Sequence, residues 1–480
     1  MDILNVQQGL NPDVEKMIIE RDIQGLMTTL EKGKDFAARM RAAEGLGSIR
    51  DERAIKLLLN LLKRNRGDVK ALAIVALGRI QGRRATQLLI ETLKDDSPYC
   101  REVSAIMLGD SGDERAIAPL TEALNDLDHI VGEKARWALV ELGTMAVYPL
   151  IDALDHGNTV TREAAIRALG EIGDEQATSP LIWTLEDEKD TIREAAAQAL
   201  GKMKDKRAVQ PLIRLLEDRN PHCREEAARA LGLIRDEGAV DALINICGDE
   251  NRDVRESVIQ ALGELGDRRA VDSLTNSLQD TDKEVRKTAV RSLGKIGEEQ
   301  VKELLLQLLQ DSDSTIREGA AVALGELQEP RAVDPLIHAL EDPSEGVREA
   351  AIRALGILGD RKALDPLRQA LKEEWVRCSI RMMGFETRVS NLPALENNWN
   401  QMQILRALYK IQGDRTTQSL IEALEEEQIN IGRDLTQTIH DYIERWGEVF
   451  PGVNRAQNRS MRAWRILKEG LADTERESYQ

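Results

Sequence analysis

The stretch that decides the fold reads DKRAVQPLIRLLEDRNPHCREEAARALGLI and spans residues 205–234. A second copy, EPRAVDPLIHALEDPSEGVREAAIRALGIL, spans residues 329–358, and about ten such copies follow one another roughly 31 residues apart. A fixed period of this length is the signature of a repeat array, in which each unit packs on the next. The period therefore predicts one elongated body over most of the 480 residues.

Two residue types keep the period most strictly, and we call them the ladder residues. An aspartate recurs every 31 residues, and an arginine follows it six positions later. An aspartate just before a helix can cap free N–H groups, and an arginine fork can bridge to a carboxylate of the next unit. The sequence therefore predicts a structural ladder made of Asp187, Arg193, Asp218, Arg224, Asp249, Arg255, Asp280, Arg286, Asp311, Arg317, Asp342 and Arg348.

The sequence of each repeat predicts two helices and no strand. The first helix has apolar residues at helical spacing, as in Val209, Leu212 and Leu216, and a proline such as Pro211 falls near its start. The second helix is rich in alanine and ends in Leu-Gly, where Gly232 suits a helix end or a close approach to the next unit. A single pair cannot cover its own apolar face. The expected fold is therefore all-α, a right-handed α-α superhelix of about eleven helix pairs.

The pattern RAVxPLIxALxDxxxxVRxxAAxALGxIG resembles the HEAT-like repeats of the phycobilisome-lyase (PBS lyase) type, over residues 22–372. The resemblance implies a HEAT-repeat solenoid in which the ladder residues join adjacent units. It is much less specific for function. Repeats of this type occur in bilin lyase subunits, in phycobilisome-degradation factors, in a di-iron hydroxylase and in scaffold proteins. The hydroxylase branch binds iron through repeated His-Glu dipeptides, and this chain has none.

Composition and motifs argue against several classes of function. The formal charge of −18 opposes binding to nucleic acid or to anionic membranes. The four cysteines form no CxxC pair, and we expect no metal site, no cofactor and no catalytic residue. The N-terminus lacks the features of a signal peptide, and no apolar run is long enough to span a membrane. A cytoplasmic location is the expectation.

The second helices offer the first candidate surface for a partner, because they usually line the concave face of such solenoids. A row of glutamates follows the ladder arginines by one residue, and a mixed row follows them by five. One interpretation is a solvated face whose Glu and Arg side chains pair one turn apart. The other is a groove that recognises a protein, with tryptophan as an anchor. The candidate binding residues in this row are Trp137, Arg167, Arg229, Arg291 and Arg353.

The C-terminal end offers the second candidate surface, because the repetition fails there. The sequence predicts an N-terminal segment (1–21), the repeat array (22–372), an irregular break (373–400), a divergent helix pair (401–447) and a basic amphipathic helix with a polar tail (448–480). Aromatic residues and arginines gather in the break, where they either close the end of the stack or form an interface. The candidate binding residues are Trp375, Arg377, Arg381, Phe385 and Trp399.

Three functions from different classes follow from these observations. The first is a non-enzymatic scaffold or adaptor for other proteins, which uses the concave face and the divergent C-terminal end. The alternative, suggested by the resemblance alone, is a bilin (tetrapyrrole) lyase subunit or chromophore chaperone, in which paired arginines would hold propionates. The third is a nucleic-acid repair module, which the charge opposes.

Overall fold

The computed structural model describes residues 12–64, 67–80 and 82–370. The break, the divergent pair and the basic helix expected beyond residue 372 lie outside these residues, and so do Trp375, Arg377, Arg381, Phe385 and Trp399. The described residues fold into α-helices and short 3-10 helices, with no strand among them. They form two compact units, one up to Ser273 and one from Leu274.

The first unit begins with α1 (Pro12–Ile19), which lies within the predicted N-terminal segment and packs on the helices that follow. Its further helices are α2 (Ile23–Lys32), α3 (Phe36–Ile49), α4 (Glu52–Arg64), α5 (Asp68–Ile80), α6 (Arg83–Thr92), α7 (Pro98–Ser111), α8 (Ile117–Ala123), α9 (His129–Glu141), α10 (Val147–His156), α11 (Thr159–Ile172), α12 (Thr178–Thr184), α13 (Asp190–Met203), α14 (Val209–Leu215), α15 (Pro221–Ile234), α16 (Val240–Asn245) and α17 (Arg252–Leu265).

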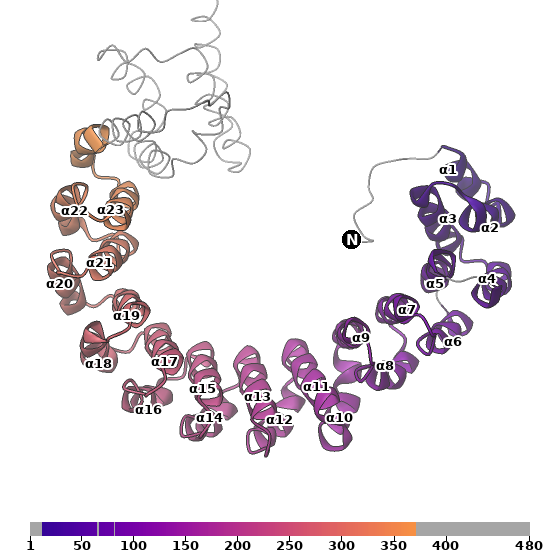
Figure 1. The fold of residues 1–480 in the computed structure, drawn as a ribbon, viewed down its shortest axis with the longest axis horizontal. Coiled ribbons are helices and arrows are strands. Elements are labelled where there is room, and N and C mark those ends of the chain that lie inside the picture. The colour runs from indigo at the N-terminus through magenta and orange to yellow at the C-terminus, as the bar shows by residue number, and fades with distance from the viewer. Residues whose placement is uncertain (1–11, 65–66, 81, 371–480) are drawn as a thin grey trace, which may run out of the picture. The chain divides into compact units, whose positions relative to one another are not determined.

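Helix α18 (Val271–Asn276) spans the boundary between the units. The second unit continues with α19 (Lys283–Ile296), α20 (Glu299–Leu308), α21 (Ser314–Glu326), α22 (Val333–Ala339) and α23 (Glu345–Leu358). Helices α2 to α23 follow the chain as eleven pairs, which confirms the predicted all-α solenoid. Within each unit, the second helices of the pairs form the inner layer and the first helices form the outer layer (Figure 1).

Most first helices start with a 3-10 turn. In the repeat at residues 205–234, Asp205 caps the turn Lys206–Ala208 by accepting a hydrogen bond from the N–H of Arg207, and α14 follows directly. Pro211 is therefore the third residue of the α-helical part rather than its first. This position still lies in the first α-helical turn, where a missing N–H is tolerated.

The repeats pack closely through the Ala-Leu-Gly sequence at the end of each second helix. A Cβ atom added to Gly201 would lie 2.8 Å from Cα and 2.9 Å from Cβ of Ala230, in the next second helix. Gly109, Gly170 and Gly232 face the equivalent alanines in the same way. Of the two roles predicted for this glycine, the structure supports the close approach between neighbouring repeats. The helix ends three residues later, for example at Lys204, in the left-handed conformation.

Candidate protein-binding surface

The ladder residues connect consecutive repeats within each unit. Arg193 donates from Nε to Oδ2 of Asp218 over 2.7 Å and from Nη2 to Oδ1 over 2.9 Å. Its third nitrogen, Nη1, donates to the backbone carbonyl of Asp187 in its own repeat over 2.8 Å. One guanidinium therefore holds the turn before its own helix and the aspartate of the next repeat. The same arrangement recurs at Arg101 with Asp126, Arg224 with Asp249, and Arg317 with Asp342.

Each ladder aspartate also shapes a turn. Oδ1 of Asp218 accepts a hydrogen bond of 2.8 Å from the backbone N–H of Asn220, and Asn220 in turn caps α15. The ladder aspartate thus orients the capping residue rather than capping the helix itself. Burial alone would raise the pKa of the Asp218 carboxyl, but the bonds from Arg193 and from the Asn220 N–H hold that pKa below its usual value.

The ladder varies at identifiable positions. Lys70 takes the place of the arginine and pairs with Asp95. Arg286 donates from Nε to Oδ2 of Asp313 over 2.7 Å, two residues beyond the predicted Asp311. Because Arg255 and Asp280 lie in different units, their rung stays a prediction.

One rung is absent as a whole from the described part of the chain. Arginines bind the aspartate of the following repeat, so Gly132 and His156 occupy the two positions of a single rung. The next arginine, Arg162, donates from Nε to the carbonyl of Leu154 over 2.8 Å and still pairs with Asp187. The ladder is therefore interrupted between α9 and α11 and resumes directly afterwards.

A second periodic network, which was not predicted, joins the outer helices. The aspartate that caps a 3-10 turn binds the arginine two residues later, as Asp205 binds Arg207 over 2.6 Å. Arg207 also donates to the carbonyl of Glu175 in the preceding repeat over 3.0 Å. Arg269 repeats this contact with the carbonyl of Glu237 over 3.1 Å. The recurring Asp-x-Arg-Ala motif in the sequence could have predicted this network.

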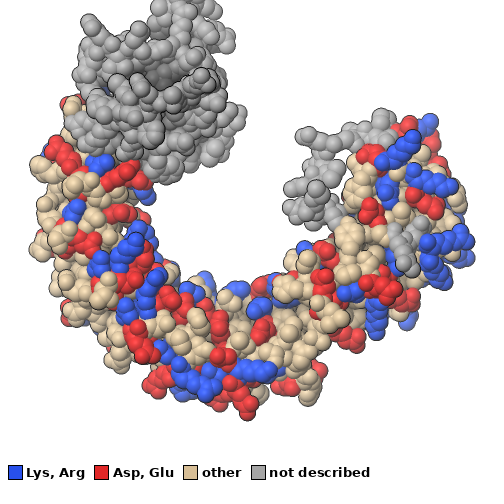
Figure 2. Space-filling view, viewed as in Figure 1, with Lys and Arg blue, Asp and Glu red and all other residues tan. Residues whose placement is uncertain are grey.

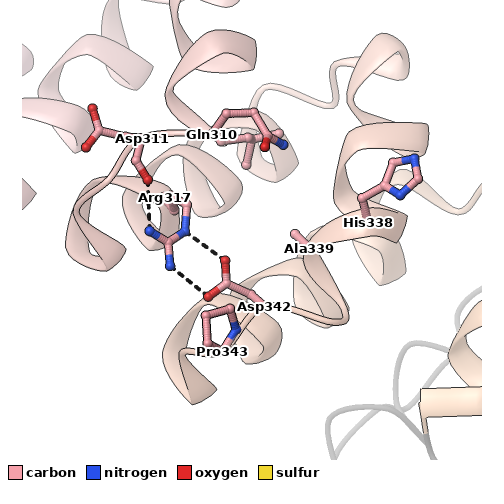
Figure 3. A pocket seen from close by; sticks show the side chains of 8 residues that line it. Gln310, Asp311, Arg317, His338, Ala339, Asp342 and Pro343 are labelled. Carbon is pink, nitrogen blue, oxygen red and sulfur yellow. Dashed lines mark hydrogen bonds and ion pairs between the residues drawn. The ribbon is translucent and has the colours of Figure 1, made fainter.

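A hollow of about 360 Å³ in the second unit lies at a rung of the ladder and is shown in Figure 3. It is lined by Leu309, Gln310, Asp311, Arg317, His338, Ala339, Asp342 and Pro343. Its central polar groups, Arg317 and Asp342, already bind each other. The hollow therefore lacks the convergent and unmatched polar groups that mark a small-molecule site.

The predicted arginines of the second helices are mostly self-paired. Arg229 lies 2.6 Å from Glu225 and 2.7 Å from Glu226, and Arg353 lies 2.8 Å from Glu349. Arg167 lies farther from its partner, 3.6 Å from Glu163. Arg291 differs, because Lys287 stands one turn before it and no carboxylate among the described residues pairs with it. Both signs of charge are interspersed on the face shown in Figure 2.

Trp137 is the fifth candidate of this row. It lies on α9 in the inner layer with 38% of its surface exposed, so its indole is available for contact. Trp137 stays a predicted binding residue, and the exposed apolar residues near it in the sequence were not predicted. Exposed apolar side chains gather in the three repeats formed by α8 and α9, α10 and α11, and α12 and α13. They are Leu127, Ile130, Met145, Tyr148, Val160 and Trp183. A comparison of equivalent positions could have predicted the exposure of Ile130, because its equivalents in later repeats are polar, as at Thr191, His222 and Asp253.

The chemistry of the described residues points to no catalytic centre that can be named. Burial raises the pKa of the Cys223 and Cys247 thiols to about 11, so both stay protonated at neutral pH. The neighbouring His222 and Cys223 do not form a ligand pair, because the His222 side chain is exposed while the Cys223 side chain is buried. In residues 12–64, 67–80 and 82–370, no group of three His, Cys, Asp or Glu side chains is arranged to hold a metal ion.

No single helix in the described part is long and apolar enough to cross a membrane. The segments His129–Glu141 and Gly143–His156 meet the length and composition only when taken together, and they are bent by 118°.

Family comparison agrees with this architecture. The model for HEAT repeats matches residues 59–140, 147–232, 178–261, 209–285, 240–325, 274–340 and 303–381. The PBS lyase HEAT-like repeat matches residues 38–64. Since these matches cover more than half of the chain, it belongs to the HEAT-repeat family, as predicted. A search of curated proteins finds no match.

Among solved structures, the chain is similar to the following three. Kap95p bound to RanGDP is 14% identical with a TM-score of 0.54, over 92% of this chain and 71% of that chain. Kap121p bound to Pho4p is 15% identical with a TM-score of 0.53, over 92% and 56%. Importin beta is 15% identical with a TM-score of 0.52, over 91% and 68%. At these identities the likeness is one of fold.

Proposed function

We propose that this protein is a non-enzymatic scaffold or adaptor that binds other proteins through its inner layer of second helices and its divergent C-terminal end. The observation that carries the proposal is the membership of the HEAT-repeat family together with side chains such as Trp137 and Arg291, which stand exposed on the inner layer. Repeat solenoids present extended binding surfaces of this kind. The similar Kap121p was solved with a bound protein, Pho4p.

The ladder and the Asp-x-Arg network support the same interpretation. Both sets of arginines are committed to carboxylates and carbonyls of the stack, so their repetition is explained by the fold. Recognition must then come from positions that vary between repeats. Trp137 is such a position, because its equivalents are Arg167, Gln198 and Arg229.

The bilin alternative gains no support from the described residues. Propionate binding would need free cationic pairs, whereas Arg167, Arg229 and Arg353 each have a glutamate within 4 Å. Arg291 is unpaired within the described part of the chain, but its neighbour Lys287 binds Glu318, so no free pair results there either. The match to the PBS lyase HEAT-like repeat concerns residues 38–64 and describes a type of repeat. The cytoplasmic location and the role of residues 375–399 stay predictions.

Site-specific photo-crosslinking in native lysate tests the proposal. A photoreactive phenylalanine analogue is placed at Trp137 or Gln198 on the inner layer, and at Trp183, which is exposed on the outer helix α12. We expect discrete protein adducts at Trp137 or Gln198 that are absent at Trp183. A version ending at residue 370 tests the contribution of the C-terminal end. Adducts of equal yield at all three positions, or at none of them, would refute the use of the inner layer.

A further inference from the structure

Four exposed apolar residues in the first unit form a patch that we call the apolar edge: Tyr99, Leu127, Ile130 and Val160. Tyr99, Ile130 and Val160 are the second residues of α7, α9 and α11, and they are 37%, 54% and 58% exposed. Leu127 stands fully exposed in the turn before α9. Single exposed apolar residues are common, but apolar residues at one exposed position of three consecutive repeats line the same edge of the stack.

The fold does not require apolar residues at these positions. The next repeats have Thr191, His222 and Asp253 there, and their second helices begin and pack in the same way. Nor is the position after the ladder aspartate normally apolar, since Glu188 and Arg219 take the place of Leu127. The apolar edge is therefore a departure from the repeat that packing inside the stack does not explain.

The apolar edge coincides with the interruption of the ladder. The absent rung belongs to Gly132, which lies in α9, and to His156, the last residue of α10. Helices α7, α9 and α11 pack side by side, and neighbouring packed helices lie about 10 Å apart. The apolar edge is thus about 20 Å long, roughly the length of a 14-residue helix at about 1.5 Å per residue.

The repeats that carry the apolar edge are acidic. Residues 95–172 contain 15 acidic and 6 basic residues, a net charge of −9, which is half of the −18 of the whole chain. Arg101 and Arg162 are held in rungs, and Arg136 binds both Glu133 and Glu171.

A glutamate also follows each apolar residue of the helices by one turn, at Glu102, Glu133 and Glu163. Burial raises the pKa of the Tyr99 hydroxyl, and the charges of Asp68 and Glu102 raise it further, as expected in a negative field.

We propose that the apolar edge is the docking site for a basic amphipathic helix of a partner protein. Apolar side chains seven residues apart on a helix are separated by about 10.5 Å, which matches the spacing of consecutive repeats. Lysines and arginines flanking them would meet the glutamate row, and complementary charge speeds and orients such docking. The inference rests on the proposed protein-binding function and names the partner's chemistry.

Fluorescence anisotropy with the full-length protein tests the inference. The probe is a labelled peptide of roughly 15 residues with leucines at i, i+3, i+4 and i+7 and lysines elsewhere. Its comparisons are a scrambled peptide of the same composition and a leucine/glutamate peptide. The variant L127S/I130S/V160S removes the apolar edge at exposed positions, and L233S is the matched control, since Leu233 is another exposed leucine of the same unit.

We expect the leucine/lysine peptide to bind the wild-type protein and L233S equally, and the triple variant at least about tenfold more weakly. Raising the salt concentration from about 50 to about 500 mM should weaken binding of the leucine/lysine peptide to the wild-type protein, because exposed charges are screened. The single variant L127S, at a fully exposed turn residue, should show part of the loss without any effect on folding.

Five results would overturn the inference. These are no binding of the leucine/lysine peptide to the wild-type protein, undiminished binding by the triple variant, equal binding of the scrambled peptide, equal binding of the leucine/glutamate peptide, or a wild-type dimer that the triple variant abolishes. The dimer would assign the apolar edge to a second copy of this chain. If photo-crosslinks still form at Trp137 or Gln198 while the peptide fails, only this inference fails and the scaffold function stands.

Discussion

Truncating one rung of the ladder should destabilise the stack locally and strongly. Arg224 is the best position, because it donates to Oδ2 of Asp249 over 2.8 Å, to Oδ1 over 2.9 Å and to the carbonyl of Asp218 over 2.8 Å. The side chains of Arg224 and Asp249 are only 11% and 10% exposed. Arg224→Ala therefore leaves a largely buried carboxylate with the backbone N–H of Asn251 as its remaining donor.

Breaking a buried ion pair by removing one partner costs about 3–5 kcal/mol, whereas an exposed pair contributes about 0–1 kcal/mol. The rung lies at the edge of the stack, so water can reach part of Asp249 after truncation. We therefore expect the low end of the buried range, about 3 kcal/mol. For a unit of this size, that loss corresponds to a decrease in Tm of about 6–12 °C. Arg224→Lys should recover little of it, because an ammonium cannot make the two parallel bonds.

Thermal unfolding and hydrogen exchange resolved by peptide measure the effect. Exchange should accelerate first in α15 and α17, since repeat stability depends on interfaces between neighbours. The control is Arg214→Ala in the same repeat, where the arginine is exposed and no described residue pairs with it. A double-mutant cycle with Asp249→Ala isolates the rung. Equal Tm values for Arg224→Ala and Arg214→Ala, or no coupling in the cycle, would refute the structural role of the ladder.

Two further predictions follow from the packing and from the carboxylates. Gly201→Ala should lower the free energy of unfolding by about 1–3 kcal/mol, because its Cβ would lie 2.8 Å from Ala230. Gly248→Ala is the control and should be tolerated, because nothing lies within 4 Å of its Cβ position. Urea titration of both variants measures the difference. Stability should also fall as the pH decreases from about 4 towards 2, because the pKa values of Asp113, Asp205 and Glu329 are lowered to about 2 by neighbouring arginines. A carboxyl with a lowered folded pKa stabilises above its unfolded pKa and loses that contribution on protonation. Urea titrations at pH 5, 4 and 3 with unchanged midpoints would contradict this.

The fold could be predicted from the sequence because every structural role is repeated. Leu212 in the core, Gly201 at the helix contact and Arg193 in the ladder each have equivalents one period away, so a chance pattern is excluded. Pairing of Arg229 with Glu225 also followed from their spacing on one helix turn. The register of Arg286 did not follow, because this turn offers two aspartates, Asp311 and Asp313, and Arg286 binds the second.

The candidate surface was less predictable for a physical reason. Trp137 was found by its residue type, but Ile130 and Val160 are ordinary apolar residues at helical spacing, and their exposure depends on which side of each helix meets its neighbours. Spacing within one helix does not say which face is covered. Comparing equivalent positions across repeats does say so, because Thr191, His222 and Asp253 show that the position faces solvent.

The interruption of the ladder helps to explain where such a stack can change without losing stability. Removing only the arginine of a rung would strand a buried aspartate, and removing both members strands neither. Gly132 and His156 represent the second case, and the rungs on both sides, Arg101 with Asp126 and Arg162 with Asp187, are kept. Because repeats contact only their neighbours, the change stays local. Exposed apolar residues such as Ile130 gather beside this interruption, where the change in the ladder leaves no buried charge unpaired.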